Sequence, residues 1–336
     1  MGTVTLVDFA SESTKRLMQD SLVWDTHGCM PLRPGDVEFL PQLDRYRASG
    51  VDVCSLNIGF DLTPWQNAIL VAATFRKFIR ENPDKYLLVE SVADIETARR
   101  SSRLGVIFDL EGGCALNDQI GMVEVYYLLG VRWMLFAYNK SNSLGGGCDD
   151  RDTGLTKFGR QVLDEMRAVG MVACCSHTGE RTALEIMERS GNPVIFSHSN
   201  PRALRDHYRN ISDRAIQACA ETGGVISVVG IGDFLGNNDN RTETVVNHID
   251  YLVQLVGPDH VGLGLDYVFD KQELNDFLKN NPDVFPPESY SQGIRMVRVE
   301  QTPEIVESML RRGYAEFDVR KILGENHLRV ARQVWR

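Results

Sequence analysis

The sequence predicts an α/β protein with the (β/α)8 TIM-barrel fold, and three observations support that fold class. Eight short apolar runs recur along the chain, and segments with helical spacing of apolar residues lie between them. The runs are nearly continuous in hydrophobicity, as expected for parallel strands covered on both faces. No repeat, low-complexity tract or Pro/Ser-rich linker interrupts the 336 residues. We therefore expect one barrel domain over residues 1–336, because a doubly wound open sheet would leave some of the runs unused.

The predicted strands cover residues 22–27, 51–58, 105–111, 131–138, 171–177, 193–199, 223–229 and 260–266. Residues 156–168 and 181–188 show helical spacing, and Gly170 and Gly191 soon after them are typical helix-ending residues. Two connections are unusually long, at about 139–155 and 267–297, and loops of this length commonly form lids or pocket walls. We expect both at the C-terminal face of the strands, where such barrels hold their active sites.

Composition and charge exclude several classes of protein. Hydrophobic residues make up 43% and charged residues 24% of the chain, so a large core is available and global disorder is excluded. The net charge of −10 argues against nucleic acid and an anionic membrane surface as partners. Seven cysteines without a CxxC pair favour free thiols in a reducing compartment. With no evident secretory signal and no apolar run of about 18 residues, we expect a cytoplasmic protein without membrane attachment.

Polar side chains stand where the predicted strands end. Three of the seven histidines lie there with several carboxylates, and together these are the ligand types of Zn²⁺ or a similar metal. The strand-end residues are Asp25, His27, Asn57, Glu111, Tyr138, His177, His198 and Asp266. For the other histidines we expect surface or structural roles, because they lie in helical or loop segments: His207, His248, His260 and His327.

Three acids near the strand ends need a physical explanation. Asp109 and Glu111 face the same side of one strand, and a carboxylate inside a barrel is costly unless it is paired or metal-bound. Glu111 is nearer the mouth and is the better ligand candidate. Asp109 is either a further ligand, a partner of a ligand, or an ion-pair partner of Arg132 or Arg103. Asp266 ends the segment Val-Gly-Leu-Gly-Leu-Asp, and such an acid can exchange a proton with a metal-activated water.

Nine segments spread in order over nearly the whole chain carry a family resemblance. They are WDTHGCMP (24–31), FDLEGG (108–113), AYNKSNSLGGGC (137–148), GLTKFGRQVLDEM (154–166), SHTGERTA (176–183), PVIFSHSNPRAL (193–204), RNISD (209–213), HVGLGLD (260–266) and KILGENHLRV (321–330). Together they resemble the renal (membrane) dipeptidase family of the amidohydrolase superfamily, especially its soluble bacterial members. The resemblance implies a metal-dependent barrel that hydrolyses dipeptides, often with a D-residue at the C-terminal position. It also implies a homodimer, since members of the family are often dimers.

The resemblance assigns roles to the strand-end residues. Two ions, Zn²⁺ or other divalent metals, commonly share a bridging glutamate, which corresponds to Glu111. By position, His177 and His198 hold one ion. His27 and Asp266 face the other ion, and Asp266 is also the proton shuttle.

Two further positions concern the substrate, and one departs from the family pattern. Tyr138 stands where the mammalian type has a substrate-contacting histidine, and Arg209 matches an arginine that contacts the substrate, plausibly through a carboxylate. The family usually reads His-x-Asp after the first strand, but this chain reads His27-Gly28-Cys29. Three interpretations stay open: Cys29 is a thiolate ligand, the His27 site is weak or empty, or the activity has been lost.

The leading functional hypothesis is metal-dependent hydrolysis of the amide bond in a dipeptide-like substrate. A rival keeps the barrel and the metal but acts on another small substrate, such as an N-acyl amino acid, a lactone or a cyclic amide. Another rival is a metal-poor barrel that binds a small molecule without chemistry. A serine nucleophile is less attractive, because Ser176-His177 and Ser197-His198 are neighbours that should point to opposite faces of a strand.

Overall fold

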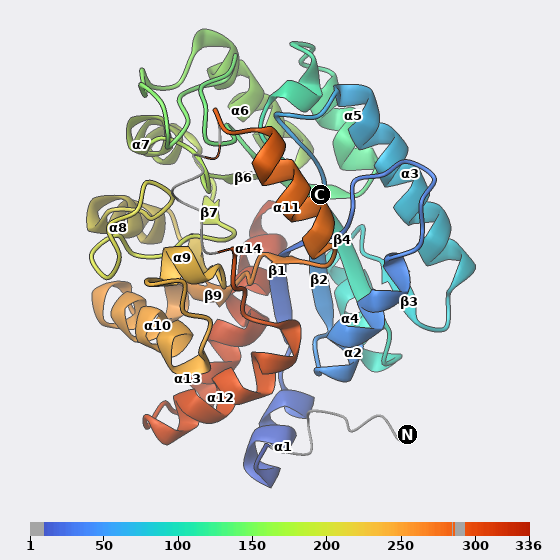
Figure 1. Ribbon diagram of the computed structural model, residues 1–336, viewed down its shortest axis with the longest axis vertical. Helices are drawn as coiled ribbons and strands as arrows, with labels where there is room; N and C mark the ends of the chain where they lie inside the picture. Colours follow the sequence, from blue (N-terminus) through green and yellow to red (C-terminus); the bar gives the residue numbers. More distant parts are fainter. Residues whose placement is uncertain (1–9, 284, 286–292) are drawn as a thin grey trace.

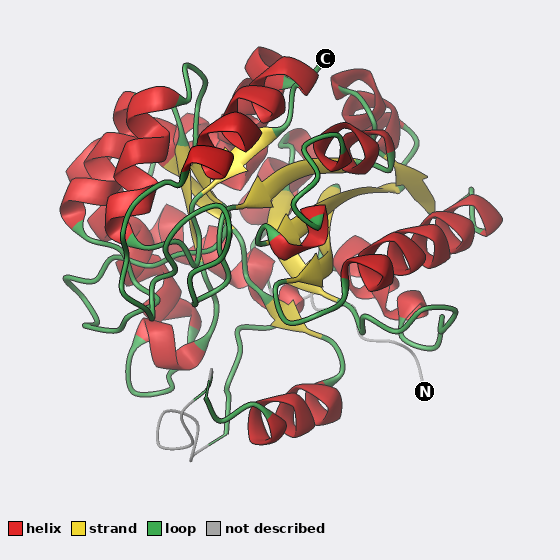
Figure 2. Ribbon diagram, turned by 90° about the horizontal axis from the view of Figure 1, so that it is seen from above, coloured by secondary structure: helices red, strands yellow, loops and turns green. Residues whose placement is uncertain are grey.

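Eight parallel strands form a closed barrel in the computed structural model, which describes residues 10–283, 285 and 293–336. β1 closes the ring by pairing Asp25 with Leu263 of β9. Helices surround these strands (Figures 1 and 2), and each predicted strand run overlaps one barrel strand, so the predicted fold class is confirmed. The barrel strands are β1 (Trp24–Cys29), β2 (Val53–Phe60), β4 (Leu104–Glu111), β5 (Val131–Leu135), β6 (Val172–Cys174), β7 (Ile195–Phe196), β8 (Val225–Val228) and β9 (Val261–Leu263).

Several helices begin at a residue whose side chain caps the first turn. In α6 (Lys157–Val169), the Thr156 side chain accepts a hydrogen bond from the Gly159 amide, and Gly170 ends the helix with a φ of 90° that favours glycine. The other helices are α1 (Glu12–Asp20), α2 (Asp44–Ala48), α3 (Trp65–Glu81), α4 (Val92–Arg100), α5 (Met122–Leu128), α7 (Glu180–Arg189), α8 (Asp213–Glu221), α9 (Gly232–Leu235), α10 (Thr242–Val256), α11 (Lys271–Asn280), α12 (Thr302–Arg311), α13 (Glu316–Arg320) and α14 (Asn326–Val334).

The segment 267–297, predicted as a long loop, contains regular structure. Its first residues form β10 (Tyr267–Val268), which pairs with β1, and α11 follows. Asp270 caps α11 by accepting hydrogen bonds from two backbone amides, and Leu274, Phe277 and Leu278 form an apolar stripe at helical spacing. The polar residues between them obscured this stripe in the sequence. Pro286 and Pro287, part of the same prediction, lie outside the described residues.

The other predicted long loop, 139–155, has neither helix nor strand and folds back against the barrel. The Asp149 amide donates to Asn139 O at 2.8 Å, and the Cys148 amide donates to His177 O at 2.9 Å. A Cβ atom on Gly147 would lie 2.1 Å from Asn139 O, so this position requires glycine. The glycine-rich part of the loop thus packs closely against residues that follow β5 and β6.

The barrel interior changes from apolar to polar along the strands. At the N-terminal end, Trp24 and Trp133 lie 6.0 Å apart in a buried cluster that also includes Ile107 and residues of α14. Asp109 and Glu111 follow Ile107 at alternate positions of β4, so all three face the same side of the strand. The polar end of the interior is therefore the C-terminal end of the barrel.

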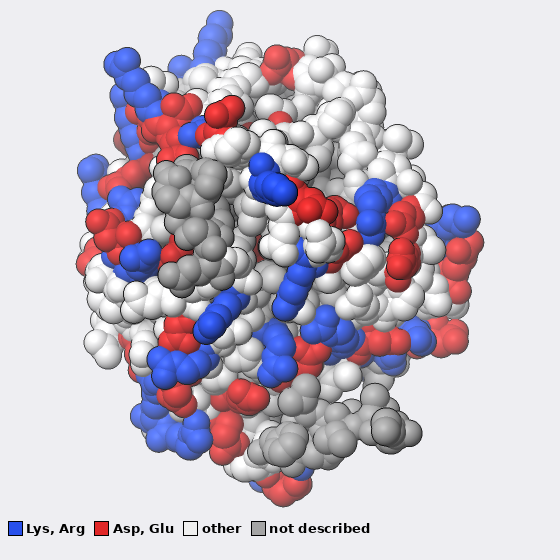
Figure 3. All heavy atoms as spheres, in the orientation of Figure 1, with Lys and Arg blue, Asp and Glu red and all other residues white. Residues whose placement is uncertain are grey.

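The molecular surface carries mixed charge. Figure 3 shows basic and acidic side chains interspersed over the visible face, without a broad basic area. Among the described residues, every helix is too short or too polar to cross a bilayer.

Candidate metal and substrate site

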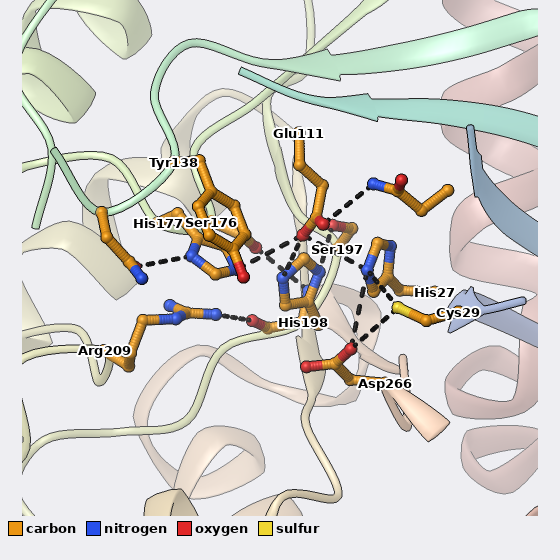
Figure 4. Close-up of polar contacts among 12 residues, drawn as sticks. His27, Cys29, Glu111, Tyr138, Ser176, His177, Ser197, His198, Arg209 and Asp266 are labelled. Atoms are coloured by element: carbon orange, nitrogen blue, oxygen red, sulfur yellow. Dashed lines mark hydrogen bonds and ion pairs between the residues drawn. The ribbon is translucent and has the colours of Figure 1, made fainter. Parts of the chain in front are cut away.

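Polar side chains from the strand ends converge on one cavity of about 260 Å³ (Figure 4). Cys29, Glu111, His177 and Asp266 line it on one side. The opposite wall is apolar and includes side chains of α11, which crosses in front of the barrel strands in Figure 1. The structure thus brings the sequence-predicted residues together at the C-terminal face.

One carboxylate oxygen stands at the centre of three imidazoles. Glu111 Oε1 lies 3.3 Å from Nε2 of His27, of His177 and of His198. Donor atoms bound tetrahedrally to one Zn²⁺ at about 2.0–2.1 Å would lie about 3.3 Å apart, so these separations suit metal ligands. Glu111 Oε2 accepts a hydrogen bond from Asn57 Nδ2 at 2.8 Å, which holds the carboxylate in place.

The other ring nitrogen of each histidine has a polar partner. His27 Nδ1 contacts Asp109 Oδ2 at 3.2 Å, and His177 Nδ1 contacts Asn139 Oδ1 at 2.7 Å. His198 Nδ1 bonds with Ser197 Oγ at 2.9 Å, whereas its Nε2 is buried and has no hydrogen-bond partner. Contacts at Nδ1 that leave Nε2 for an ion are typical of metal-binding histidines. The residues therefore fit a divalent metal.

Burial and charge shift the ionisation of this cluster. Burial alone would lower the pKa of His27, but the charges of Asp109 and Glu111 outweigh it and raise that pKa. Burial would raise the pKa of Glu111, yet attraction to His27 and the close approach of the other two imidazoles hold it well below its usual range. Burial, helped by the Arg209 charge, lowers the pKa of His177 to about 3. Glu111 is thus an anion facing at least one neutral imidazole, as metal ligation requires.

Asp266 lies at the cavity edge beside His27. Its Oδ1 is 3.7 Å from His27 Nε2 and 3.5 Å from Cys29 Sγ. Burial raises the pKa of Asp266 to about 6, against the opposing attraction of His27. Gly264, two residues earlier, lets the chain after β9 pack closely against the segment after β7, since a Cβ there would lie 1.9 Å from Ser197 O.

Three residues of the site hold strained backbone conformations. Asn139, His177 and Asp266 have φ values of 60°, 62° and 57°, in the left-handed region that non-glycine residues avoid. Such strain persists only where the surrounding structure enforces it, and it gathers at functional sites. Here it turns the His177 and Asp266 side chains into the cavity at the points where their strands end.

Tyr138 and Arg209 complete the polar side of the cavity. The Tyr138 ring stacks on the His177 ring with centroids 4.3 Å apart. Arg209 is only 2% exposed, and its guanidinium donates to His198 O at 3.4 Å and lies over the Phe234 ring. Its Nε has no hydrogen-bond partner, and the Arg209 charge acts to lower the pKa of the nearby Asp266 carboxyl. A buried cation that lacks a directly bonded anion is costly, so Arg209 is suited to an anionic ligand.

Comparison with known proteins identifies the family. The chain matches the model of the membrane dipeptidase family, peptidase family M19, over residues 13–284. The chain belongs to the membrane dipeptidase family. Members are metal-dependent hydrolases of peptide bonds, and this chain is such an enzyme.

This chain is similar to curated proteins and solved structures over most of its length. It is 30% identical over 257 residues to dipeptidase tcpJ of Claviceps purpurea, covering 75% of this chain but 56% of tcpJ. An amidohydrolase structure from Pseudomonas aeruginosa is 31% identical, with a TM-score of 0.86, and covers 96% of this chain and 99% of that one. A metallo peptidase from Rhodobacter sphaeroides, at 19% identity, has a TM-score of 0.78 and covers 94% of this chain and 100% of that one. That last likeness bears on the fold alone.

The contacts of two residues bear on the sequence predictions. Asp109 contacts His27, which is one of the roles that the sequence left open, whereas Arg132 donates to backbone carbonyls. Ser197 and His198 do form a hydrogen bond, contrary to the prediction from strand alternation, because β7 already ends at Phe196. Ser197 is fully buried and also contacts Cys174, so it holds the imidazole rather than facing the cavity.

The remaining histidines have partners away from the cavity. His248 bonds to Leu235 O, His260 to Gly224 O, His327 to Ser227 Oγ, and His207 pairs with Asp233. These contacts agree with the expected structural roles.

Sequence reasoning missed two parts of the dipeptidase site. Asn139 holds His177, and its signal was an asparagine directly after a strand run, since asparagine is enriched in left-handed conformations. The sequence also did not predict the aromatic part of the apolar wall, formed by Phe60, Phe277 and Phe285. Phe277 of α11 lies 5.3 Å from Phe60 and 5.7 Å from Phe285, measured between ring centroids. Its parts are far apart in the sequence, so only the fold reveals it.

Proposed function

We propose that this member of the family hydrolyses dipeptides that carry a free C-terminal carboxylate. The convergence of three imidazole Nε2 atoms on one Glu111 oxygen, in a cavity that also holds Arg209, is the observation that carries the proposal. The cavity of about 260 Å³ suits a small substrate rather than a folded protein chain.

His27, Glu111, His177, His198 and Asp266 would hold one or two metal ions, which we propose to be Zn²⁺. When bound, Zn²⁺ acts as a Lewis acid and lowers the pKa of water to about 7. The ligand types favour this assignment, because imidazole and carboxylate together suit zinc. The Nδ1 contacts fix the rings, so little reorganisation is needed at the moment of reaction.

Asp266 is the proposed proton carrier. A carboxylate that removes a proton from the attacking water can return it to the leaving amine, which must be protonated when the amide bond breaks. The raised pKa of Asp266, about 6, lies near neutral pH and favours transfer in both directions. In support, its Oδ1 lies 3.7 Å from Nε2 of His27, one of the proposed metal ligands.

Arg209 is the proposed anchor for the substrate carboxylate. Its guanidinium is buried without an acidic partner among the described residues, and a bidentate bond to a carboxylate would supply one. We extend the proposal to a D-configured C-terminal residue. In support, the Rhodobacter sphaeroides structure has a phosphinate mimic of L-Ala-D-Ala as ligand. The apolar wall would then face the substrate side chains.

The test is a substrate panel with metal-free and metal-loaded protein. We expect Zn²⁺-loaded protein to hydrolyse L,L- and L,D-dipeptides, and protein treated with a chelator to lose that activity until Zn²⁺ is restored. N-acyl amino acids, lactones and cyclic amides form the comparison arm. Turnover of these compounds alone, or full dipeptidase activity without metal, would refute the proposal.

We also propose a cytoplasmic location. All seven cysteines are free thiols in the structure, which suits a reducing compartment. The homodimer implied by the family remains a prediction, and sedimentation of the purified protein would test it.

A further inference from the structure

Cys29 lies beside His27 and Asp266, and their donor atoms face one another (Figure 4). Cys29 Sγ is 3.7 Å from His27 Nε2 and 3.5 Å from Asp266 Oδ1, and these two partner atoms are 3.7 Å apart. The three atoms form a nearly equilateral triangle. Cys29 is half-buried and lines the cavity, so an ion can reach it from the solvent side.

The size of this triangle suits a tetrahedral metal. With bonds of about 2.3 Å to sulfur and 2.0–2.1 Å to nitrogen and oxygen, a tetrahedral Zn²⁺ places sulfur about 3.5–3.6 Å from either neighbour. The distances from Cys29 Sγ to His27 Nε2 and to Asp266 Oδ1, 3.7 and 3.5 Å, agree closely with this range. The observed nitrogen–oxygen distance of 3.7 Å is longer than the ideal of about 3.3 Å. A small rotation of the Asp266 carboxylate would close that gap.

We propose that Cys29 is a metal ligand, and that His27, Cys29 and Asp266 form a thiolate-containing site for a soft or borderline divalent ion such as Zn²⁺ or Cd²⁺. The inference rests on the proposed function, since the ion would lie in the same cavity. Of the three interpretations left open by the sequence, this geometry favours the ligand over an empty site.

The chemistry of sulfur explains how cysteine can replace the aspartate of the family at this position. The Sγ atom of cysteine is bonded directly to Cβ, whereas a carboxylate oxygen of aspartate is two bonds away from Cβ. A cysteine ligand is therefore shorter, but the metal–sulfur bond is longer than a metal–oxygen bond and compensates for part of the difference. Coordination forms a bond from Sγ to the ion and releases the thiol proton to the buffer. A thiolate also changes selectivity, because soft ligands favour Zn²⁺ and Cd²⁺ over Mg²⁺ and Mn²⁺. The site is therefore expected to discriminate between these metals.

Cobalt spectroscopy tests the ligand directly. We expect metal-free full-length protein titrated with Co²⁺ to develop a sulfur-to-cobalt charge-transfer band in the near ultraviolet. Cys29→Ser and Cys29→Asp should lack the band. Cys148→Ser is the matched control and should retain it, because Cys148 is also half-buried near the site but its Sγ contacts Asn139 Oδ1 instead.

Affinity for Cd²⁺ provides the second measurement. Cys29→Ser should bind one of two Cd²⁺ ions about tenfold or more weakly, by equilibrium dialysis. Cys29→Asp should still bind two ions but lose preference for Cd²⁺ over Mn²⁺. Circular dichroism of each variant shows whether it is folded, and Cys29→Asp gives an independent measurement should Cys29→Ser unfold.

The outcomes separate this inference from the proposed function. A wild-type protein that hydrolyses dipeptides with Zn²⁺ but shows no charge-transfer band, or binds no Co²⁺, would overturn the thiolate ligand and leave the function intact. A band that survives in Cys29→Ser would also overturn it. A band that depends on Cys29, in a protein without dipeptidase activity, would support the site and refute the function.

Discussion

At the C-terminal end of the barrel, His198 Nε2 is buried without a hydrogen-bond partner, whereas at the N-terminal end His327 Nε2 bonds to Ser227 Oγ at 2.8 Å. Both rings are buried and both have a lowered pKa, chiefly because of burial. They differ in what surrounds them. His198 faces Glu111, and His327 lies 5.8 Å from the Trp24 ring. Burial and a lowered pKa are therefore common to both rings, and the proposal that His198 binds a metal rests instead on its unpaired nitrogen facing Glu111.

The same substitution at both ends tests this difference and gives the largest expected effect. His198→Gln should reduce dipeptidase activity to the level of metal-free protein and weaken Zn²⁺ binding by more than about 100-fold. His327→Gln should keep kcat and metal content but lower the free energy of unfolding by about 1–3 kcal/mol. Activity assays, metal analysis and denaturant unfolding measure the three quantities. Equal loss of activity in both variants would mean that His198 contributes only to packing, as His327 does.

Asp266 gives the next largest expected effect. Asp266→Asn preserves the shape of the side chain but removes the proton acceptor, so kcat should fall about 10²–10⁴-fold. The protein should keep the ion at Glu111, which elemental analysis checks. Asp25→Asn is the matched control, because Asp25 is buried in the same region and its Oδ1 accepts from the Leu265 and His27 amides. A similar kcat loss in both variants would indicate disturbed packing rather than proton transfer.

Arg209 should have a smaller effect that depends on the substrate. Arg209→Met removes the guanidinium, and loss of a charged hydrogen bond costs about 1.5–3 kcal/mol, so kcat/KM should fall about 10–100-fold. The loss should largely disappear with dipeptide amides, which lack the carboxylate. If Arg209→Met lowers kcat/KM equally for free and amidated dipeptides, Arg209 does not bind that carboxylate.

The two ends of the barrel also differ in how well the sequence predicted them. The residues of the polar end could be predicted because three histidines and several acids stand at the ends of apolar runs. The C-terminal ends of barrel strands lie close together in space. Asn139 and α11 were not recognised, because their roles depend on a left-handed turn and on packing across the cavity. At the apolar end, the Ser227 partner of His327 is 100 residues away. Sequence spacing gives no sign of such a contact.

The smallest expected effect is the pH dependence of stability caused by His327. Burial, together with the Arg329 charge, lowers the pKa of His327 to about 3, whereas an unfolded histidine has a pKa of about 6.5. Between these values the unfolded chain binds more protons. The stability from neutral His327 is therefore complete above about pH 6.5 and is lost as the pH falls toward 3, by about 1.4 kcal/mol per pH unit.

Raised carboxyl pKa values complicate a direct reading of that slope. Burial raises the pKa of Asp25 to about 7 and that of Asp52 to about 6. Because the folded protein binds a proton at these carboxyls more tightly than the unfolded chain does, their contribution to stability increases as the pH falls, opposite to that of His327. The difference between wild type and His327→Gln cancels these contributions. Measured by urea unfolding of the metal-free proteins from pH 7 to 5, the stability advantage of the wild type should shrink as pH falls. A difference that stays constant over this range would mean that the imidazole is not kept neutral by the apolar end of the barrel.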